Sequence, residues 1–551
     1  MSQEKSQEEV EIRELWIKKI CDNHKHTKFE TKEIYDFIIV GAGTAGCVLA
    51  RELIYCIPKI SILVLEAGGP DAHSNGLISL PCTWPTAAFL VDDHNWGYVT
   101  EEQKMQSHIN PTKEMIKKAK EYNNWAAQGP EYKIWDWDHC LEVFKAMENN
   151  SRKKSDKNFK KFHGFNGLLH VEDCHDGIQD IMSGVIDAAK NLDIPYNEDF
   201  NGERQNGVGT YQFTSKEGKR CSLVDSYLRD ALKKVELHPG LESNDIGKVA
   251  AVDIRSYTHV LDIIWDKENK KENIAIGVRY FYNGIIREVF VAPKGEVILC
   301  GGVFNSPQIL MISGVGPKEN LEANNIKIRR ELPVGRNLMD HPSCSISAKS
   351  TKGSIHHLSS GGEIVIIHKA NVEGKIPCKE NFFDENPDCQ ITATPFCSPS
   401  KYNNTDRINL LPALNVPSSV ADDLYRMISS LKLCREIIKQ PPLSTVYNVK
   451  EIGINDEFGK WCTNDIDMSD EDWEKYILNK SFSSSHACGT VKMAPESKGG
   501  VVNHRLQVHG TKNLRVVDAS IFPYIPSGNT NAPTAMVAWK ASRLIIEDYM
   551  E

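Results

Sequence analysis

Residues 36–69 restrict the fold of this chain more than any other stretch. They begin with an apolar, β-branched run at residues 37–40, which is typical of a strand buried on both faces. A helical pattern covers residues 45–54, and Pro58 ends it. A second apolar run follows at residues 61–65. The alternation of short strand, helix and strand predicts a βαβ unit with parallel strands.

Three glycines and one acid give this βαβ unit its chemistry. Gly41, Gly43 and Gly46 follow the first strand in the G-x-G-x-x-G spacing, and Glu66 follows the second strand. The first glycine allows a tight turn, the second lets a pyrophosphate approach the backbone, and the third lets the helix pack closely on the strand. The helix N-terminus attracts phosphate, and the acid accepts hydrogen bonds from a ribose diol. This order predicts an adenine-dinucleotide site, for either NAD or FAD, rather than a glycine-rich turn without function.

Length and composition limit the other function classes. A chain of 551 residues is too long for one compact domain and predicts two or three. The formal net charge of −9 argues against a nucleic-acid partner. We expect no transmembrane segment, no signal peptide and a cytoplasmic location, because no apolar run reaches about 18 residues and the first residues are polar and Glu-rich. The 15 cysteines lack metal-ligand spacing, which predicts reduced thiols and no metal site.

Patterns elsewhere predict a mixture of helices and strands. Residues 135–149 and 421–440 have helical periodicity, and residues 176–235 look helical around a loop at 197–218. The segment 245–300 indicates antiparallel β structure that returns to the core sheet. Within this segment we expect strands at residues 248–255, 260–265, 275–280, 287–292 and 296–300.

Several motifs in the second half of the chain match one family. They are GEVILCGGVFNSPQILMISGVGP at residues 295–317, LPVGRNLMDHP at 332–342, HACGTVKM at 486–493, LRVVDAS at 514–520 and GNTNAPT at 528–534. Together with YDFIIVGAGTAGCVLA and LEAGG at the start of the chain, they resemble the glucose–methanol–choline (GMC) oxidoreductases, and most closely the choline-dehydrogenase-like branch. The resemblance is specific, because several long motifs occur in the right order.

The resemblance implies an α/β fold (α+β overall), FAD rather than NAD, and two domains. One is a Rossmann-like FAD-binding domain of GMC type, and the other is a β-sheet substrate-binding domain. We expect an N-terminal extension at residues 1–34, read as a surface helix. We expect the FAD-binding domain at residues 35–175, 220–342 and 486–551, and the substrate-binding domain at 176–219 and 343–485.

The resemblance also implies roles for single residues. Gly41, Gly43, Gly46 and Glu66 would hold the ADP half of FAD, and the backbone of Val249 would meet the adenine. Asp518 and Ala519 would lie along the ribityl–pyrophosphate chain, and Asn531 would lie at the edge of the flavin ring.

Alcohol oxidation removes a hydride from carbon and a proton from oxygen, so the protein must supply a base. His486 lies in a Ser-rich loop before a Gly-Thr pair, and Asn529 offers an amide to the same oxygen. The family has a His and a second His or Asn at these positions. With 18 histidines in the chain, a histidine chosen at random is usually structural, and the flanking motif is what favours His486. The predicted partners are a small-molecule alcohol and an electron acceptor, which is oxygen or of the quinone or dye type.

The chain departs from the family at the loop that normally covers the flavin. Residues 101–106 lead straight to residues 107–110, so the Gly-Gly turn and everything before it is missing. Counting back from residues 122–125 aligns Asn110 with the end of that loop, where it would still reach the flavin. The leading hypothesis is an FAD-dependent alcohol dehydrogenase or oxidase of the GMC type, and two alternatives to it stay open. One is a binding or structural protein that has weakened or lost its flavin activity, and the other is a lyase on the same fold.

Overall fold

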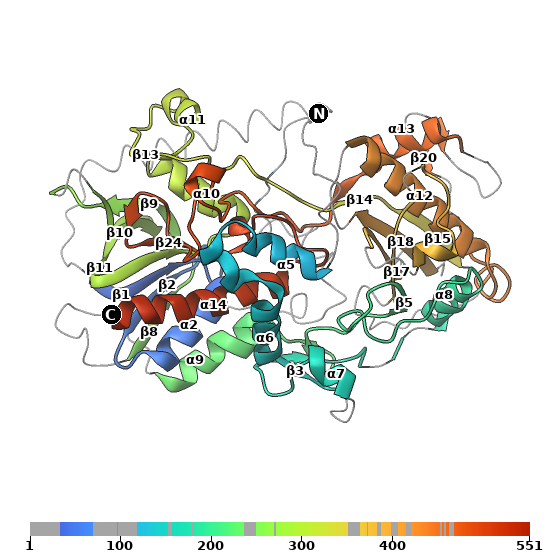
Figure 1. Ribbon diagram of the computed structural model, residues 1–551, viewed down its shortest axis with the longest axis horizontal. Coiled ribbons are helices and arrows are strands. Elements are labelled where there is room, and N and C mark those ends of the chain that lie inside the picture. The colour runs from blue at the N-terminus through green and yellow to red at the C-terminus, as the bar shows by residue number, and fades with distance from the viewer. Residues whose placement is uncertain are drawn as a thin grey trace.

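The computed structural model describes residues 33–69, 96, 98, 118–152, 157–175, 177–178, 180–235, 250–268, 272–350, 364–371, 373–382, 387–397, 406–414, 420–451, 454–456, 459–461 and 468–551. Figure 1 shows two sheets at opposite ends of the long axis, each with its own helices. The first sheet lies beside α2 and α14, and the second beside α8, α12 and α13. The helices α5 and α6 lie between these two bodies.

The first sheet is built around the predicted βαβ unit. In the described residues its order is β23-β10-β11-β1-β2-β8, with β24 paired to β11 and β9 paired to β10. Parallel pairing joins β24, β11, β1, β2 and β8, whereas β9, β10 and β11 pair antiparallel. The strands are β1 (Glu33–Val40), β2 (Ser61–Leu65), β8 (Ala251–Arg255), β9 (His259–Trp265), β10 (Asn273–Tyr282), β11 (Ile285–Leu299), β23 (Thr511–Lys512) and β24 (Leu514–Val516).

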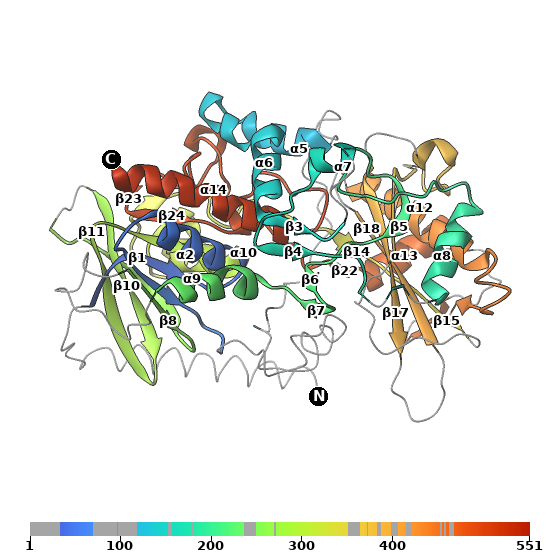
Figure 2. The same cartoon turned by 90° about the horizontal axis from the view of Figure 1, so that it is seen from below.

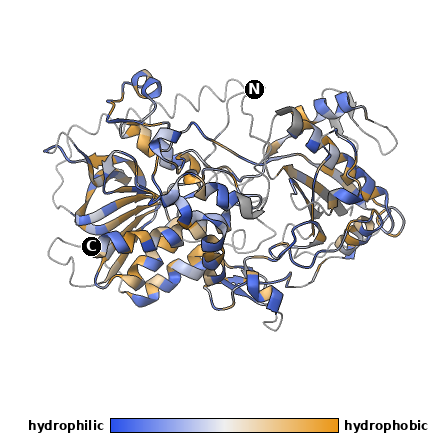
Figure 3. Cartoon of the chain, viewed as in Figure 1, coloured by the Kyte–Doolittle hydropathy of each residue, from blue (hydrophilic) through white to orange (hydrophobic). Residues whose placement is uncertain are grey.

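Two helices from opposite ends of the chain cover this sheet together. The helices α2 (Thr44–Cys56) and α14 (Asn531–Met550) lie side by side in Figures 1 and 2 and pack against each other. The strands of the sheet are largely orange in Figure 3, as expected of parallel strands buried on both faces. All of β2 is buried, and so are the last six residues of β1. The first and last thirds of the chain therefore share one core.

The second sheet has a core of its own. Its order in the described residues is β19-β15-β18-β17-β16-β5, with β14 paired to both β18 and β22. The strands are β5 (Gly207–Thr210), β14 (Pro342–Ser343), β15 (Ile346–Ser350), β16 (Ile364–His368), β17 (Cys389–Cys397), β18 (Asp406–Leu414), β19 (Lys450–Glu451) and β22 (Phe482–Ser483). The helices α8 (Asp180–Lys190), α12 (Val420–Lys439) and α13 (Asp470–Lys480) pack on it. A capping box between Ser469 and Asp472 starts α13.

The remaining described elements are helices, short helical turns and two-stranded sheets. The remaining described helices are α5 (Lys118–Ala126), α6 (Trp137–Met147), α7 (Lys157–Phe162), α9 (Arg229–Lys234), α10 (Gly302–Ile312) and α11 (Lys318–Ala323). The 3₁₀ and π turns are η3 (Pro130–Trp135), η4 (Val224–Leu228), η5 (Lys379–Phe382), η6 (Glu496–Lys498) and η7 (Ala519–Ile521). The remaining strands are β3 (Glu148–Asn150), β4 (Leu169–Val171), β6 (Ser215–Lys216), β7 (Lys219–Arg220), β12 (Val315–Gly316), β13 (Arg330–Glu331), β20 (Ile454–Asp456) and β21 (Gly459–Trp461).

The predicted fold class, a Rossmann-like α/β domain with a second β-sheet domain, is confirmed, but several element boundaries were wrong. The helix expected at residues 135–149 is α6, which starts after the capping carboxylate of Asp136 and ends where β3 pairs with β4. The two strands expected at 287–292 and 296–300 form one strand, β11, because β1 pairs with it on both sides of a register shift.

The loop expected at 197–218 contains β5, an edge strand that pairs with β16. Its sequence, GVGT, is too short and too rich in glycine to carry a strand pattern. The surface helix expected at residues 1–34 lies mostly outside the described residues, and residues 33 and 34 belong to β1.

Candidate active site

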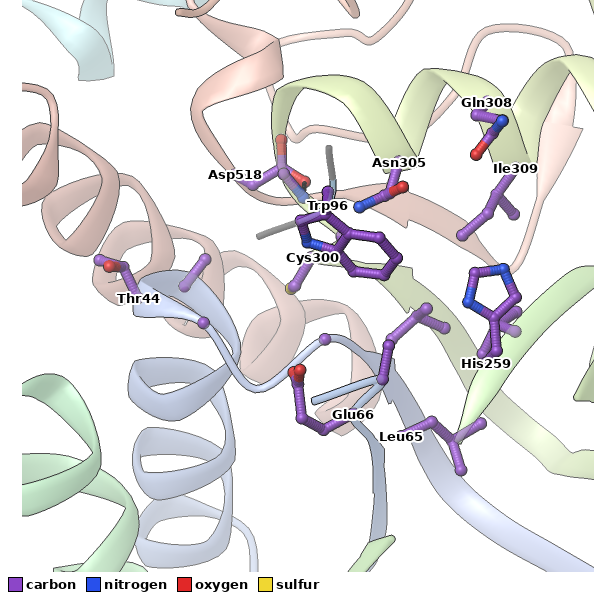
Figure 4. A pocket seen from close by; sticks show the side chains of 18 of the residues that line it. Thr44, Leu65, Glu66, Trp96, His259, Cys300, Asn305, Gln308, Ile309 and Asp518 are labelled. Atoms are coloured by element: carbon purple, nitrogen blue, oxygen red, sulfur yellow. Dashed lines mark hydrogen bonds between the residues drawn. The ribbon is translucent and has the colours of Figure 1, made fainter. Parts of the chain in front are cut away.

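A cavity of about 330 Å³ opens at the carboxyl ends of the parallel strands (Figure 4). It is bounded by the glycine turn after β1, the end of β2 with Glu66, the start of β9 at His259, the start of α10 and Asp518. Ligands of open α/β sheets bind at this edge, and typical ligand sites measure about 300–1,000 Å³. The position and size of the cavity therefore fit part of a dinucleotide.

The three glycines of the turn have different surroundings. Gly41 has a φ of 106°, and a Cβ added there would lie 2.4 Å from the carbonyl oxygen of Cys300. A Cβ on Gly46 would lie 2.0 Å from the carbonyl oxygen of Gly41, so α2 could not pack this closely on the strand. A Cβ on Gly43 would meet nothing within 4 Å. Gly41 and Gly46 therefore shape the turn, whereas Gly43 leaves open space at the cavity.

Glu66 holds the glycine turn as well as facing the cavity. Its Oε2 accepts a hydrogen bond of 2.6 Å from the backbone N–H of Ala42, and its Oε1 accepts one of 2.7 Å from the N–H of Gly68. Each carboxylate oxygen can accept two hydrogen bonds, so acceptor capacity for a ribose diol remains. The sequence predicted the ribose contact but not the contact with Ala42.

Asp518 ties α10 to the C-terminal part of the chain. Its Oδ2 accepts hydrogen bonds from the N–H of Gly302 at 2.9 Å and from the hydroxyl of Ser306 at 2.6 Å. Burial raises the pKa of Asp518, although the hydrogen bonds that it accepts oppose this. The next residue, Ala519, lines the cavity and accepts a hydrogen bond of 3.0 Å from the N–H of Gly489. This bond links the cavity to the segment that carries His486.

Three helices begin at or beside the cavity. The first residues of α2 and α10 line it, as does Thr534 in the first turn of α14. None of the three helices has an acidic residue in its first turn. Asn531, which starts α14, accepts a hydrogen bond of 2.6 Å from the hydroxyl of Thr44 in α2. Helix N-termini carry unpaired N–H groups and partial positive charge, so the residues present fit the pyrophosphate of FAD.

Sequence reasoning missed several cavity residues. Trp96 lies over the cavity in Figure 4, with its ring 6.1 Å from that of His259. Asn305 and Gln308 project from α10 toward the same space. Burial lowers the pKa of His259, so this histidine is neutral near pH 7. The family motif at residues 295–317 contains Asn305 and Gln308, but its pattern gave no indication of which side chains face the cavity.

His486 lies beside Asn529. The Nε2 of His486 lies 3.1 Å from the amide nitrogen of Asn529, and its Nδ1 lies 3.0 Å from the Nδ1 of His341. The backbone N–H of His486 donates a 3.1 Å hydrogen bond to Asp340. Burial lowers the pKa of His486, and the Asp340 carboxylate only partly opposes this. Ser485 has a φ of 61°, an unusual conformation that is common at functional sites.

A second buried histidine, His163, has a raised pKa, in contrast to His486. The Nδ1 of His163 lies 3.0 Å from a carboxylate oxygen of Glu148, and its Nε2 lies 3.1 Å from one of Asp199. Burial alone would lower the pKa of His163, but the hydrogen bonds to Asp199 and Glu148 raise it to about 9. His163 is therefore protonated near pH 7 and cannot accept a proton.

The structure brings most of the predicted residues together at two places. Gly41, Gly43, Glu66, Asp518 and Ala519 line the cavity, and Gly46 lies directly behind the turn. His486 and Asn529 form a separate pair outside the cavity lining. Asn110 and Val249 lie outside the described residues, so their predicted contacts remain predictions. Among the residues that the structure describes, no group of three His, Cys, Asp or Glu side chains could hold a metal ion.

Solved structures resemble the fold along nearly the whole chain. Pyridoxine 4-oxidase from Mesorbium loti superposes with a TM-score of 0.72 and 21% identity, over 92% of this chain and 98% of that one. A variant of formate oxidase from Aspergillus oryzae RIB40, whose FAD modification has been studied, gives a TM-score of 0.72 and 19% identity, over 94% and 99% of the two chains. In the part of the chain that the structure describes, no helix is both long and apolar enough to span a membrane.

Curated relatives and family models give the more specific comparison. An alcohol dehydrogenase (acceptor) from Pseudomonas putida is 29% identical over 572 residues, covering 93% of this chain and 96% of the relative. Mitochondrial choline dehydrogenase from Homo sapiens is 29% identical over 586 residues, covering 94% and 90% of the two chains. Two models described as GMC oxidoreductase match residues 35–343 and 402–538. The chain therefore belongs to the GMC oxidoreductase family, as its motifs predicted.

Proposed function

We propose that this protein oxidises an alcohol to an aldehyde or ketone, with FAD as cofactor and His486 as the base. The observation that carries the proposal is the contact between His486 and Asn529, which joins a neutral imidazole to an amide at 3.1 Å. The similarity to an alcohol dehydrogenase and to choline dehydrogenases supports a substrate with a CH–OH group.

The first part of the mechanism is the holding of the cofactor. In this proposal Gly43 leaves room for the pyrophosphate, the N-termini of α2 and α10 neutralise part of its charge, and Glu66 accepts from the ribose hydroxyls. Asp518, Ala519 and Asn531 border the path from this half toward the flavin. Asn110 and the backbone of Val249 complete the set that we assign from the sequence. When bound, FAD supplies the acceptor for the hydride.

The second part is the removal of the proton. The alcohol O–H bond breaks, and the proton moves to Nε2 of His486. Because burial lowers the pKa of His486, its imidazole is neutral near pH 7. The lone pair of Nε2, which faces the amide nitrogen of Asn529, takes the proton when the alcohol lies between the two side chains. Asn529 donates its amide N–H to the same oxygen, which stabilises the negative charge that forms there.

The same proposal includes the division of the chain. The residues at 35–175, 220–342 and 486–551 form the FAD-binding domain, and those at 176–219 and 343–485 form the substrate-binding domain. The two separate cores support this division, since the second core draws its residues from Ile181 to Val208 and from Cys344 to Ile477. The electron acceptor is oxygen or a quinone-type compound. A cytoplasmic location stays a prediction.

The test is a spectrum of the purified protein. We expect a yellow protein whose flavin absorption bleaches when an alcohol is added without oxygen. A panel of choline, aryl alcohols and aliphatic alcohols identifies the substrate, and parallel assays with oxygen and with a dye separate an oxidase from a dehydrogenase. A colourless protein that does not take up added FAD would contradict the proposal and favour a binding or structural protein.

A further inference from the structure

His341 lies directly behind the proposed base. It belongs to the LMDHP motif, whose sequence alone indicates no role for this histidine. Its side chain is buried, with 1% of its surface exposed. Its ring stands nearly perpendicular to that of His486, with an interplanar angle of 85° and 5.2 Å between the centroids. The two Nδ1 atoms are 3.0 Å apart, which is hydrogen-bond distance.

The segments that carry the two histidines are fixed to each other. The Oδ1 of Asp340 accepts the backbone N–H of His341 at 2.7 Å and that of His486 at 3.1 Å. Met339 and Cys488 exchange two backbone hydrogen bonds, of 3.0 and 2.8 Å. The N–H of Ser484 also donates to the carbonyl oxygen of His341 at 3.0 Å. The contact between the imidazoles is therefore held by the backbone on both sides.

A hydrogen bond between two Nδ1 atoms contains one proton, so one ring donates and the other accepts. The Nε2 of His486 faces the amide nitrogen of Asn529, which can only donate. Nε2 must therefore be the unprotonated nitrogen that accepts from this amide, and in a neutral imidazole the proton is then on Nδ1 of His486. It follows that Nδ1 of His341 is the acceptor.

We propose that His341 is a positioning residue that holds His486 in the tautomer whose Nε2 accepts the alcohol proton. The inference rests on the proposed function, in which His486 is the base. When the proton of the alcohol moves to Nε2, the Nδ1–H of His486 continues to donate to His341. The acceptor thus orients the ring before the transfer and stabilises the imidazolium after it, as the carboxylate does for the histidine of a catalytic triad.

The other groups near His486 are consistent with His341 as the acceptor of its Nδ1–H. His341 contacts the imidazole of His486, Asp340 acts on its charge, and Cys488 lies two positions along the chain. Burial raises the pKa of Cys488 far above its ordinary value, so the thiol stays neutral. Asp340 accepts backbone N–H groups of both segments and the hydroxyl of Ser483. Among the recorded contacts, His341 is the titratable group bonded to the ring itself.

The experiment uses a matched pair of variants in the full-length holoprotein. In His341→Asn the Oδ1 can take the place of Nδ1 as acceptor, and His341→Leu has nearly the same shape without an acceptor. The rate of anaerobic flavin reduction at saturating alcohol should fall roughly 10–100-fold in His341→Leu, by analogy with the cost of removing the hydrogen-bond partner that orients a metal-bound histidine. The rate of His341→Asn should stay within about threefold of wild type, a bound set by the retained hydrogen bond.

The pH profile separates positioning from a structural role. The apparent pKa of the reduction rate should be lower in His341→Leu than in wild type and nearly unchanged in His341→Asn, because the acceptor stabilises the protonated ring. Ser343→Ala is the control, since Ser343 contacts Ser484 in the same segment at 2.5 Å but does not bond the imidazole. It should match wild type in rate and pH profile.

Equal rates in the Leu and Asn variants, or an unchanged rate in His341→Leu, would overturn the inference. If His341→Leu does not fold or does not retain FAD, His341→Gln replaces it, because its longer side chain moves the acceptor away from the Nδ1 position. The Gln variant should then be slow while the Asn variant is not, and equal rates would overturn the inference. A wild-type rate in His486→Ala would instead overturn the proposed function.

Discussion

The cofactor cavity and the pair formed by His486 and Asn529 are built in different ways. The glycine turn and Glu66 come from a single βαβ unit, and hydrogen bonds to the backbone of Ala42 and Gly68 fix the acid. His486, in contrast, contacts a histidine that is 145 positions away and an asparagine that is 43 positions away. The cavity depends on local backbone geometry, whereas the pair depends on side chains that meet only in the folded protein.

This difference implies that the two regions control different properties of the protein. The cavity residues affect the binding of the cofactor, and the pair formed by His486 and Asn529 affects the removal of the proton after the cofactor is bound. The two sets share no hydrogen-bond partner among the side-chain contacts of the described residues. Neighbouring residues link them through the backbone bond from Gly489 to Ala519 and the bond from Thr44 to Asn531. A substitution in one region should therefore leave the measured property of the other region nearly unchanged.

The largest effect is expected for His486→Ala. Removing the base should slow anaerobic flavin reduction by about 10²–10⁴-fold, the usual contribution of a placed general base. The affinity for FAD should not change, because His486 does not line the cavity. Stopped-flow reduction at saturating alcohol measures the rate, and the flavin-to-protein ratio checks occupancy. Loss of flavin from this variant would show that the two regions are not separate.

Glu66→Ala should affect the opposite property. The change removes the ribose acceptor and the bond to Ala42, and hydrogen bonds to charged groups contribute roughly 1.5–3 kcal/mol. The dissociation constant of FAD, measured by fluorescence titration of the apoprotein, should rise about 10- to 150-fold, since 1.4 kcal/mol is a factor of ten. The reduction rate at saturating FAD should stay near wild type. An unchanged dissociation constant would remove Glu66 from the cofactor site.

Asn529→Ala should have a smaller effect on the same step as His486. It removes one hydrogen-bond donor to the charged oxygen and leaves the proton acceptor, and hydrogen bonds to charged groups contribute roughly 1.5–3 kcal/mol. We expect the reduction rate to fall roughly 10- to 150-fold with no change in FAD affinity. A loss as large as that of His486→Ala would mean that Asn529, and not only the imidazole, is essential for removing the proton.

The pH dependence should be weak near neutrality. A base acts only in its unprotonated form, so the reduction rate is full above the pKa of His486 and falls as the pH drops through it. Because burial lowers this pKa from its ordinary value of about 6.5, the midpoint of the fall should lie below pH 6.5. A stopped-flow pH series checks this. A rate that already declines between pH 8 and 7 would indicate a base with a raised pKa, such as the protonated His163 has.

The sequence predicted local features better than contacts at a distance. The glycine spacing and the apolar runs predicted β2 and α2 to within two residues, because backbone geometry there depends on neighbouring residues. The edge strand β5 was missed because its pairing with β16 stabilises it, and its own residues carry no strand pattern. Trp96 and His259 were missed because their meeting depends on the packing of distant segments.

The contact between His341 and His486 could not be predicted from the motif that contains His341. The residues of LMDHP were noted as a family signature, yet nothing in their order indicates that His341 turns toward His486. That contact requires the backbone bonds between Met339 and Cys488, which exist only in the folded chain. The motif thus predicted the family, and the structure was needed to suggest the role.

The double variant Glu66→Ala/His486→Ala tests the separation of the two regions most directly. The dissociation constant of FAD and the reduction rate at saturating FAD are measured for wild type, both single variants and the double variant. If the regions are independent, the effects add within about 0.5 kcal/mol in each property, as expected of sites without shared partners. The double variant should then bind FAD like Glu66→Ala and reduce it like His486→Ala. An interaction energy above about 1 kcal/mol in either property would contradict the account.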